Sequence, residues 1–325
     1  MARLVRIALW AIGGVLGAAL VVAALLIWGP HVTPSNVSSI SPEYVNSFGT
    51  KGGSGPVLRR PIGVATSSNR TRTVYVSDAA TNRIHAYTHQ GEYRFSFGEP
   101  GDGPGELQRP MHMSVGPEEN LYVAEYLNDR ISVFEPDGTF VRHIVSEKFD
   151  APAGVDVAED GTVYVADFYN HVVRVFDAKG NLQATWGEPG RIFGGQLHYP
   201  TDVAVAPDGT LWVADAYNDR LQRFVSGESS EIGGWGLFGW AFGFDVADGL
   251  GVDPKGRVYG TDFYNGRIRV FDTDGTPIAT FGAPGDGPGQ FDRPNDIAFV
   301  SARAYVVDFG NARIQIWNLH ASPSR

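Results

Sequence analysis

Three residues that can bind a divalent cation occupy the same place in three similar segments of the chain. His112, Asp202 and Asp296 each stand two residues after a proline that opens a short apolar run. One imidazole and two carboxylates make a ligand set for zinc or calcium. The matching places in three other segments hold glycine, namely Gly63, Gly154 and Gly249. This pattern predicts a polar or metal site where the segments converge. Alternatively, each aspartate only caps the start of its strand.

A second pattern consists of tyrosines that follow an acidic residue by one or two positions. These tyrosines are Tyr126, Tyr169, Tyr217 and Tyr264. Rings with a polar edge are favoured at binding surfaces, so the four are candidate ligand-binding residues. The alternative is that some of them fill gaps between repeated units.

Residues 233–244 form an insertion in which five aromatic rings alternate with glycine. If exposed, this segment is an apolar patch for a partner protein, with Trp235, Phe238 and Trp240 as its candidate contacts. The alternative is an irregular strand that packs on the fold.

Other chemistries lack the residues they need. The chain has no cysteine, and it contains no Gly-x-Ser-x-Gly, His-Glu-x-x-His or phosphate-binding loop. We therefore predict no catalytic residue. The net charge of -10 argues against nucleic acid as a partner, because a phosphate backbone binds clustered cations.

Six copies of one unit must position these residues. Each copy has a β-branched and aromatic run that ends in an acidic residue; these are Asp78, Glu125, Asp167, Asp215, Asp262 and Asp308. Their spacings are 47, 42, 48, 47 and 46 residues. Such a period with such a composition is typical of four-stranded blades. We predict an all-β, six-bladed β-propeller over residues 44–318 and a tail over 319–325.

The acidic residues are expected to hold their own loops through backbone N–H groups rather than to form a ring for a cation. An arginine follows five of them at a regular distance; these are Arg83, Arg130, Arg220, Arg267 and Arg313. The third copy has Val172 at that place, so the arginine is expected to be dispensable there.

The order of strands within a blade predicts which residues share a face. The loops between second and third strands and the linkers between blades lie on one face, called here the top face. The tyrosines therefore lie on the top face, and His112, Asp202 and Asp296 lie at the mouth of the central channel. The last copy lacks a fourth strand, which residues 44–48 are expected to supply, so that the ring closes without an open edge.

The N-terminal region has a separate signature. Residues 7–28 are an uncharged apolar run, long enough to cross a bilayer as a helix, and Arg3 and Arg6 precede it. We expect residues 1–28 to form a cytoplasmic start and one transmembrane signal-anchor helix. Residues 29–43 form a polar tether, and the propeller is periplasmic or extracellular. A cleaved signal peptide is the alternative.

The repeat resembles the NHL family in three of its motifs. They are residues 200–205 (Pro-Thr-Asp-Val-Ala-Val), 163–167 (Val-Tyr-Val-Ala-Asp) and 265–271 (Asn-Gly-Arg-Ile-Arg-Val-Phe). The resemblance covers residues 44–318 and implies a six-bladed propeller, not one activity. Where the family's peptide-amidating lyase carries zinc-binding histidines, this chain has Ile62, Met111, Ala153, Thr201 and Asn295. This departure argues against that activity.

Three function classes follow. The first is a membrane-anchored module that binds a small molecule or a protein on its top face, with no cofactor. The second is a hydrolase or lactonase that uses calcium or zinc at His112, Asp202 and Asp296. The third is a scaffold of an envelope complex that uses the aromatic insertion.

Overall fold

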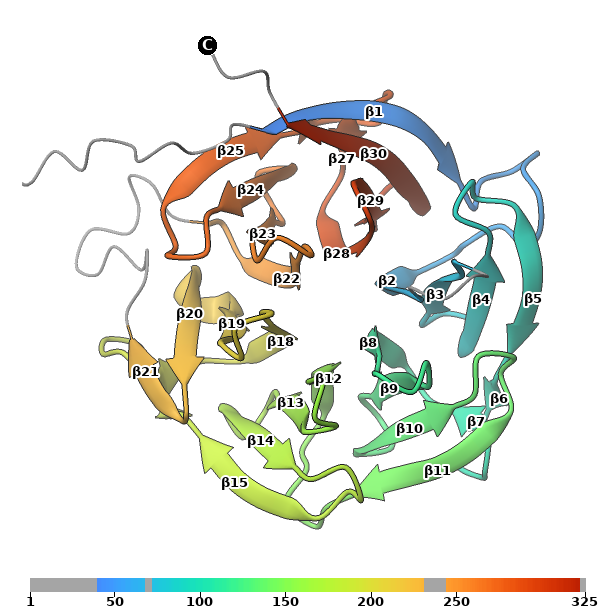
Figure 1. Cartoon of the computed structure of the whole chain (residues 1–325). Helices are drawn as coiled ribbons and strands as arrows, with labels where there is room; N and C mark the ends of the chain where they lie inside the picture. The colour runs from blue at the N-terminus through green and yellow to red at the C-terminus, as the bar shows by residue number, and fades with distance from the viewer. Residues whose placement is uncertain (1–39, 68–71, 231–243, 322–325) are drawn as a thin grey trace, which may run out of the picture. The chain divides into compact units, whose positions relative to one another are not determined.

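The computed structural model describes residues 40–67, 72–230 and 244–321. Six four-stranded antiparallel sheets stand around a central axis, with the first strand of each sheet nearest the axis (Figure 1). The prediction of an all-β, six-bladed propeller is confirmed.

The strands follow one order in every blade, from the axis outward. The innermost strands are β2 (Pro61–Thr66), β8 (Pro110–Val115), β12 (Pro152–Val157), β18 (Pro200–Val205), β22 (Ala247–Val252) and β28 (Pro294–Val300). The second strands are β3 (Val74–Asp78), β9 (Leu121–Glu125), β13 (Val163–Asp167), β19 (Leu211–Asp215), β23 (Val258–Asp262) and β29 (Arg303–Asp308). The third strands are β4 (Arg83–Tyr87), β10 (Arg130–Phe134), β14 (Val172–Phe176), β20 (Arg220–Val225), β24 (Arg267–Phe271) and β30 (Arg313–Ala321). The outer strands are β5 (Tyr93–Phe97), β11 (Phe140–Val145), β15 (Leu182–Trp186), β21 (Glu228–Ser230), β25 (Pro277–Phe281) and β1 (Ile40–Phe48).

Short parallel pairs lie in three of the linkers between blades. They are β6 (Glu99–Pro100) with β7 (Glu106–Leu107), β16 (Glu188–Pro189) with β17 (Gln196–Leu197), and β26 (Ala283–Pro284) with β27 (Gln290–Phe291). A 3-10 turn, η1 (Ala216–Asn218), follows β19. These linkers follow blades one, three and five. The type of linker therefore alternates around the ring, as do glycine and polar residues at the third position of the inner strands.

The hydrophobic core lies between neighbouring blades. Tyr75 and Ile84 of the first blade, for example, pack in one cluster with Leu121 and Phe134 of the second. Each second strand therefore meets apolar side chains on both of its faces. This explains why residues 163–166 (Val-Tyr-Val-Ala) of β13 do not alternate with polar residues.

The acidic residue that ends each second strand is fully buried and holds its own blade together. Asp215 illustrates the pattern: it accepts the backbone N–H of His198 at 2.7 Å, and Nε of Arg220 donates to it at 2.8 Å. Buried carboxylates of this kind need such donors.

One expectation about the arginines is wrong. The third blade does not dispense with its arginine, because Nε of Arg174, two residues beyond Val172, donates to Asp167 at 2.5 Å. In the first blade, Arg83 instead pairs with Glu99 at 2.8 Å. The basic side chain beside Asp78 there is His85, whose Nε2 lies 4.0 Å from a carboxylate oxygen.

The ring closes through the N-terminal strand. β1 pairs antiparallel with β30 as the fourth strand of the sixth blade. The ladder runs from Phe48 opposite Ile314 to Ile40 opposite Ala321. Residues 40–43, expected in the tether, and residues 319–321, expected in the tail, are therefore strand. Both strands are longer than expected because the backbone N–H and C=O groups at the start of β1 pair with those at the end of β30.

Several predicted features lie outside the described residues. These are the apolar run at residues 7–28, most of the tether, and the candidate contacts Trp235, Phe238 and Trp240. Within the described ranges, no helix has the length and apolar character needed to cross a bilayer. Phe244, the last ring of the insertion, is buried and packs against Phe271 of β24.

Candidate functional site

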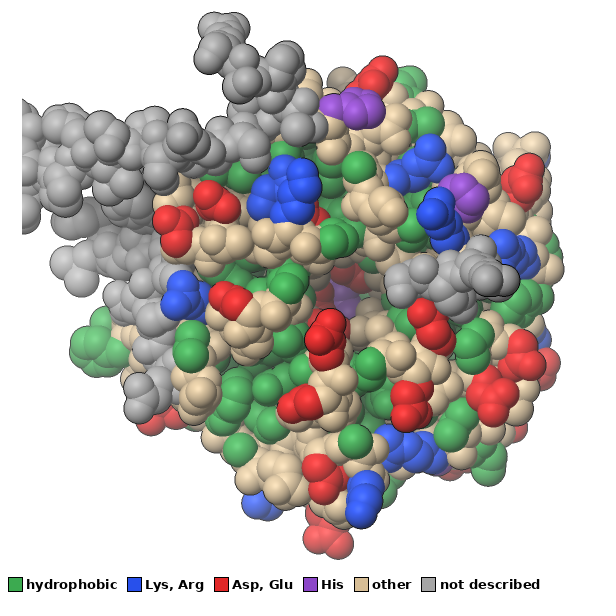
Figure 2. All heavy atoms as spheres, in the orientation of Figure 1, with side chains coloured by type: hydrophobic (Ala, Val, Ile, Leu, Met, Phe, Trp, Pro, Cys, Tyr) green, Lys and Arg blue, Asp and Glu red, His purple; other side chains and the backbone are tan. Residues whose placement is uncertain are grey.

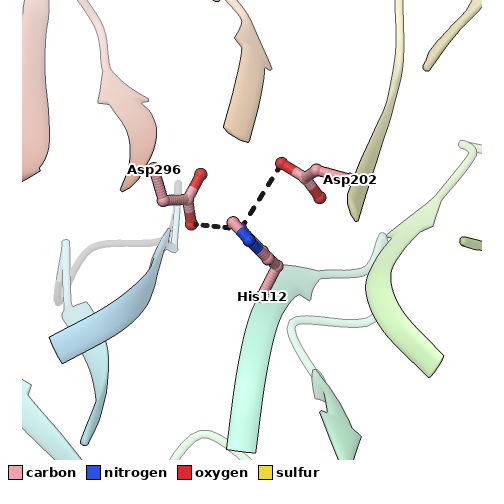
Figure 3. A group of neighbouring side chains, drawn as sticks. All are labelled: His112, Asp202 and Asp296. Carbon is pink, nitrogen blue, oxygen red and sulfur yellow. Dashed lines mark ion pairs between the residues drawn. The ribbon is translucent and has the colours of Figure 1, made fainter. Parts of the chain in front are cut away.

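The inner strands β8, β18 and β28 bring His112, Asp202 and Asp296 together on the propeller axis (Figure 3). His112 Nδ1 lies 3.5 Å from Asp202 Oδ2 and 3.4 Å from Asp296 Oδ2. Candidate ligand atoms of all three residues lie within 4.8 Å of one another. We call these three residues the axial cluster. The convergence expected from their equal positions in alternate repeats is thus observed.

Backbone groups of the neighbouring blades hold the two carboxylates in place. Asp202 Oδ2 accepts the N–H of Leu250 at 3.0 Å. Asp296 Oδ2 accepts the N–H of Val64 at 2.7 Å, and its Oδ1 accepts the N–H of Ile297, also at 2.7 Å. Each aspartate therefore ties its blade to the next one around the ring. The suggestion that the aspartates cap strands is partly right, since they do bond to inner-strand backbone.

The glycines between the polar positions have a steric cause. A Cβ added to Gly154 would lie 2.6 Å from Cα of Asp202, and one added to Gly249 would lie 2.9 Å from Cα of Asp296. At Gly63 the same atom would lie 2.8 Å from Cα of His112. Six side chains do not fit around the axis at this level. Three glycines give room to three polar residues.

The axial cluster is buried and carries excess negative charge. His112, Asp202 and Asp296 are 2%, 4% and 3% exposed. Burial alone lowers the pKa of His112, but the carboxylates of Asp202 and Asp296 outweigh it and raise that pKa to about 10. Burial, opposed by the charge of His112, raises the pKa of Asp202 to about 8. Two buried carboxylates require a positive charge between them, which either a proton on His112 or a metal cation can supply.

Two further acidic residues on the inner strands were not predicted. Asp248 bonds to the side-chain amide of Asn295, and burial raises the pKa of Asp248 to about 6. Asp156 accepts the Ser114 hydroxyl and the N–H of Val205, the latter at 2.7 Å. Asp248 escaped notice because Ala247 replaces the proline that marks the other inner strands. Asp156 lies two residues beyond the position compared among repeats.

A cavity of about 280 Å³ leads to the axial cluster from the face of the tight turns, which is opposite to the top face. Asp202, Asp296 and Asp156 line it together with inner-strand residues such as Val205 and Leu250. Figure 2 shows a hollow at the centre of this face, with acidic and histidine side chains at its floor. The cavity therefore reaches the cluster from the face of the tight turns.

The top face carries a continuous group of aromatic side chains over blades two to four. Tyr126 stands 5.9 Å from Tyr169, and Tyr199 links Tyr169, at 6.0 Å, to Tyr217, at 5.0 Å. Phe168 lies within 6.3 Å of all four rings. We call these five residues the aromatic cluster. Tyr169 and Tyr217 are its most exposed members, at 49% and 54%.

Side chains around the aromatic cluster fix its geometry. His171 and His198 stack at 5.3 Å, and both contact the Tyr199 ring, at 4.4 and 4.5 Å. The Arg109 guanidinium lies 4.3 Å above the Tyr126 ring. None of Tyr199, His171 and His198 was predicted. The only sequence signal is that Tyr199 directly precedes the strand-opening Pro200.

Tyr264 is the predicted tyrosine that does not join this cluster. It packs edge-on against Phe263 at 4.9 Å, and Phe263 in turn contacts Phe309 at 6.2 Å. Its ring is 62% exposed. Among the described residues, the top face thus has two separate aromatic groups, and the one over blades two to four is the more extended.

Comparison with known proteins agrees with this architecture. A family profile described as "NHL repeat" matches residues 149–176 and 197–224, which correspond to the third and fourth blades. The E3 ubiquitin-protein ligase TRIM71 of Rattus norvegicus is 51% identical over 45 residues, 14% of this chain and 5% of the ligase. The chain thus matches only a small part of that curated relative.

Solved structures share the fold at low identity. Virginiamycin B lyase from Staphylococcus aureus has a TM-score of 0.58 and 16% identity, over 86% of this chain and 88% of that chain. The gluconolactonase XC5397 from Xanthomonas campestris has a TM-score of 0.60 and 16% identity, over 81% and 87%. The chain is a six-bladed β-propeller that contains NHL repeats.

Proposed function

We propose that this protein is a binding module that recognises a segment of a partner protein through the aromatic cluster on its top face. The observation that carries the proposal is the unbroken contact of five rings over three blades, with Tyr169 and Tyr217 half exposed. The linker between blades three and four also exposes Ile192 and Phe193, at 65% and 66%. Large exposed rings and aliphatic side chains supply contact area at low entropic cost.

Charge favours a basic segment as the ligand. The chain has a net charge of -10. Arg109 already lies against the face of Tyr126, which is the contact that an arginine or lysine of a partner would make with an exposed tyrosine. A partner segment with cationic side chains is therefore expected to stack on Tyr169 and Tyr217.

Selection from a random peptide display library on the full chain tests this proposal. The wild type should enrich peptides with arginine or lysine, and Tyr169→Ser/Tyr217→Ser should not bind them. Tyr264→Ser is the matched control, because Tyr264 is at least as exposed as Tyr169 and Tyr217 but lies outside the cluster. Equal binding by the double variant and the control, or no enrichment by the wild type, would contradict the proposal.

We further propose that residues 7–28 anchor the protein in a membrane, with its N-terminus in the cytoplasm and the propeller outside. The uncharged apolar run and the preceding Arg3 and Arg6 support this orientation. In a cell with a single membrane, the propeller would lie on the outside, so protease added to intact cells should cleave it. In a double-membrane cell it should do so only after the outer membrane is opened. Protection until the inner membrane is lysed would refute the orientation.

A cation-dependent hydrolase or lactonase that works in the central channel is the second candidate. The observation that favours it is the axial cluster at the floor of a cavity of about 280 Å³. A cation there would polarise a carbonyl or activate a water molecule. Hydrolysis of a panel of lactones and esters, lost in Asp202→Asn/Asp296→Asn, would support it. Absence of turnover in the metal-loaded wild type would leave binding as the function.

A further inference from the structure

We infer that the axial cluster is a binding site for a single first-row transition-metal ion, with zinc as the foremost candidate. His112, Asp202 and Asp296 would be its protein ligands. The inference concerns the second candidate function and not the aromatic cluster. The ion can be bound without any reaction, so metal content rather than hydrolysis decides it.

The first argument is a buried ring nitrogen without a hydrogen-bond partner. His112 Nδ1 is buried, lies between the two carboxylates and has no hydrogen-bond partner among the described residues. Its distances of 3.4 and 3.5 Å to the aspartate oxygens exceed the hydrogen-bond range of about 2.7–3.2 Å. An imidazole held only by direct hydrogen bonds would be expected to lie closer to one carboxylate.

The second argument is the spacing itself. Nitrogen and oxygen ligands lie about 2.0–2.1 Å from a tetrahedral zinc ion, so two of them stand about 3.3 Å apart. The two observed nitrogen–oxygen distances are close to this value. The three atoms all lie within 4.8 Å of one another, so an ion among them would mainly have to draw the two carboxylate oxygens closer together.

The third argument is rigidity and charge. Backbone N–H groups of Leu250 and Val64 donate to Oδ2 of Asp202 and Asp296, the same oxygens that lie near His112, and metal-binding carboxylates commonly have such outer-shell hydrogen bonds. A divalent ion with two carboxylates and a neutral imidazole gives a site without net charge, which suits its burial.

The ligand types select the ion. Calcium prefers six to eight oxygen ligands, whereas one imidazole with two carboxylates suits zinc or a neighbouring transition metal. Three protein ligands also leave a coordination position for water or for an oxygen of a small molecule. Because Asp202 and Asp296 line the central cavity, such a molecule would reach the ion from the face of the tight turns.

Metal content of the full chain tests the inference. The protein is stripped with a chelator, incubated with zinc, desalted and analysed for bound metal, with affinity measured against a competing chelating dye. We expect one zinc ion per chain in the wild type. In Asp202→Asn/Asp296→Asn we expect affinity to fall by more than about a hundredfold, since loss of even an outer-shell partner costs 10–100-fold.

Asp156→Asn is the matched control, because Asp156 lines the same cavity but lies outside the cluster, and it should bind zinc like the wild type. Cobalt bound to the wild type gives a readout that needs no variant, since its visible spectrum reports a low-coordinate site with nitrogen and oxygen ligands. A wild type that retains no zinc and gives no such spectrum would overturn the inference. Undiminished zinc in a folded double variant would do the same. Neither result depends on the tyrosines, so the top-face proposal stands or falls separately.

Discussion

The imidazole Nδ1 of His171 accepts a hydrogen bond of 2.9 Å from the backbone N–H of Tyr199. The bond joins the third blade to the linker that leads into the fourth. Both residues have a positive φ, 58° for His171 and 53° for Tyr199, which non-glycine residues rarely adopt. The corresponding side chains in three other blades accept the same backbone bond; they are Asn82, Asp129 and Asp219.

The first prediction concerns this bond. His171→Ala removes the acceptor of a half-buried N–H and should lower the free energy of unfolding by about 1 kcal/mol. His171→Asn should keep most of the stability, because asparagine tolerates positive φ and does the same work at Asn82. Urea unfolding of the three proteins measures the difference. Equal stability of the two variants would show that the bond does not stabilise the fold.

The second prediction is a dependence of stability on pH. Burial lowers the pKa of His171 from 6.5; the charge of His198 adds to this, and the carboxylate of Asp215 opposes it. A histidine with a lowered pKa stabilises the fold above its unfolded-state pKa, and this contribution is lost as the pH falls through the folded-state pKa. Protonation of Nδ1 also removes the acceptor for Tyr199.

Wild type should therefore lose stability relative to His171→Asn as the pH falls below about 6.5. Melting temperatures of both proteins between about pH 7.5 and pH 5 provide the measurement. Comparison with His171→Asn cancels the histidines that lie away from His171, which titrate in both proteins. A difference that stays constant over this range would rule out His171 as the cause.

The number of blades could be predicted because one buried residue repeats in one register. Asp78 and its five counterparts end the second strand of every blade, where neighbouring backbone needs an acceptor. The axial cluster could be predicted for the same reason, since the opening prolines align the inner strands.

The aromatic cluster could be predicted only in part. Tyr199 and His198 come from a linker, which the alignment of strands does not place beside the loop of Tyr169.

The pairing of charges could not be predicted from alignment alone. Arg174 replaces the missing arginine at Val172 because residues two apart on β14 point to the same side of the sheet. Arg83, although aligned with the other arginines, faces Glu99 instead. Every repeat keeps the buried carboxylate at the end of its second strand, but the basic side chain beside it comes from different positions on the third strand.

The third prediction compares two arginines in equivalent positions. The side chain of Arg220 is 10% exposed and that of Arg267 is 39% exposed, and each donates through Nε to the aspartate of its blade. Arg220→Gln leaves Asp215 buried without its cation and should cost about 3 kcal/mol. Arg267→Gln should cost about 1 kcal/mol or less, since water reaches that pair. Denaturant unfolding of both variants decides this, and equal losses would show that burial does not set the energy of these pairs.

The fourth prediction concerns the glycines at the axis. A Cβ at Gly249 would lie 2.0 Å from the backbone oxygen of Asn295, so Gly249→Ala must displace β28 and with it Asp296. We expect a loss of about 3 kcal/mol in the free energy of unfolding, as for a strongly overpacked core.

The control is Gly53→Ala, where the nearest atom lies 3.3 Å away on an exposed loop. If the axial cluster holds zinc, Gly249→Ala should also weaken zinc binding while Gly53→Ala should not. A Gly249→Ala protein as stable as the wild type would mean that the inner strands can separate freely. The alternation of glycine and polar residues would then have no steric cause.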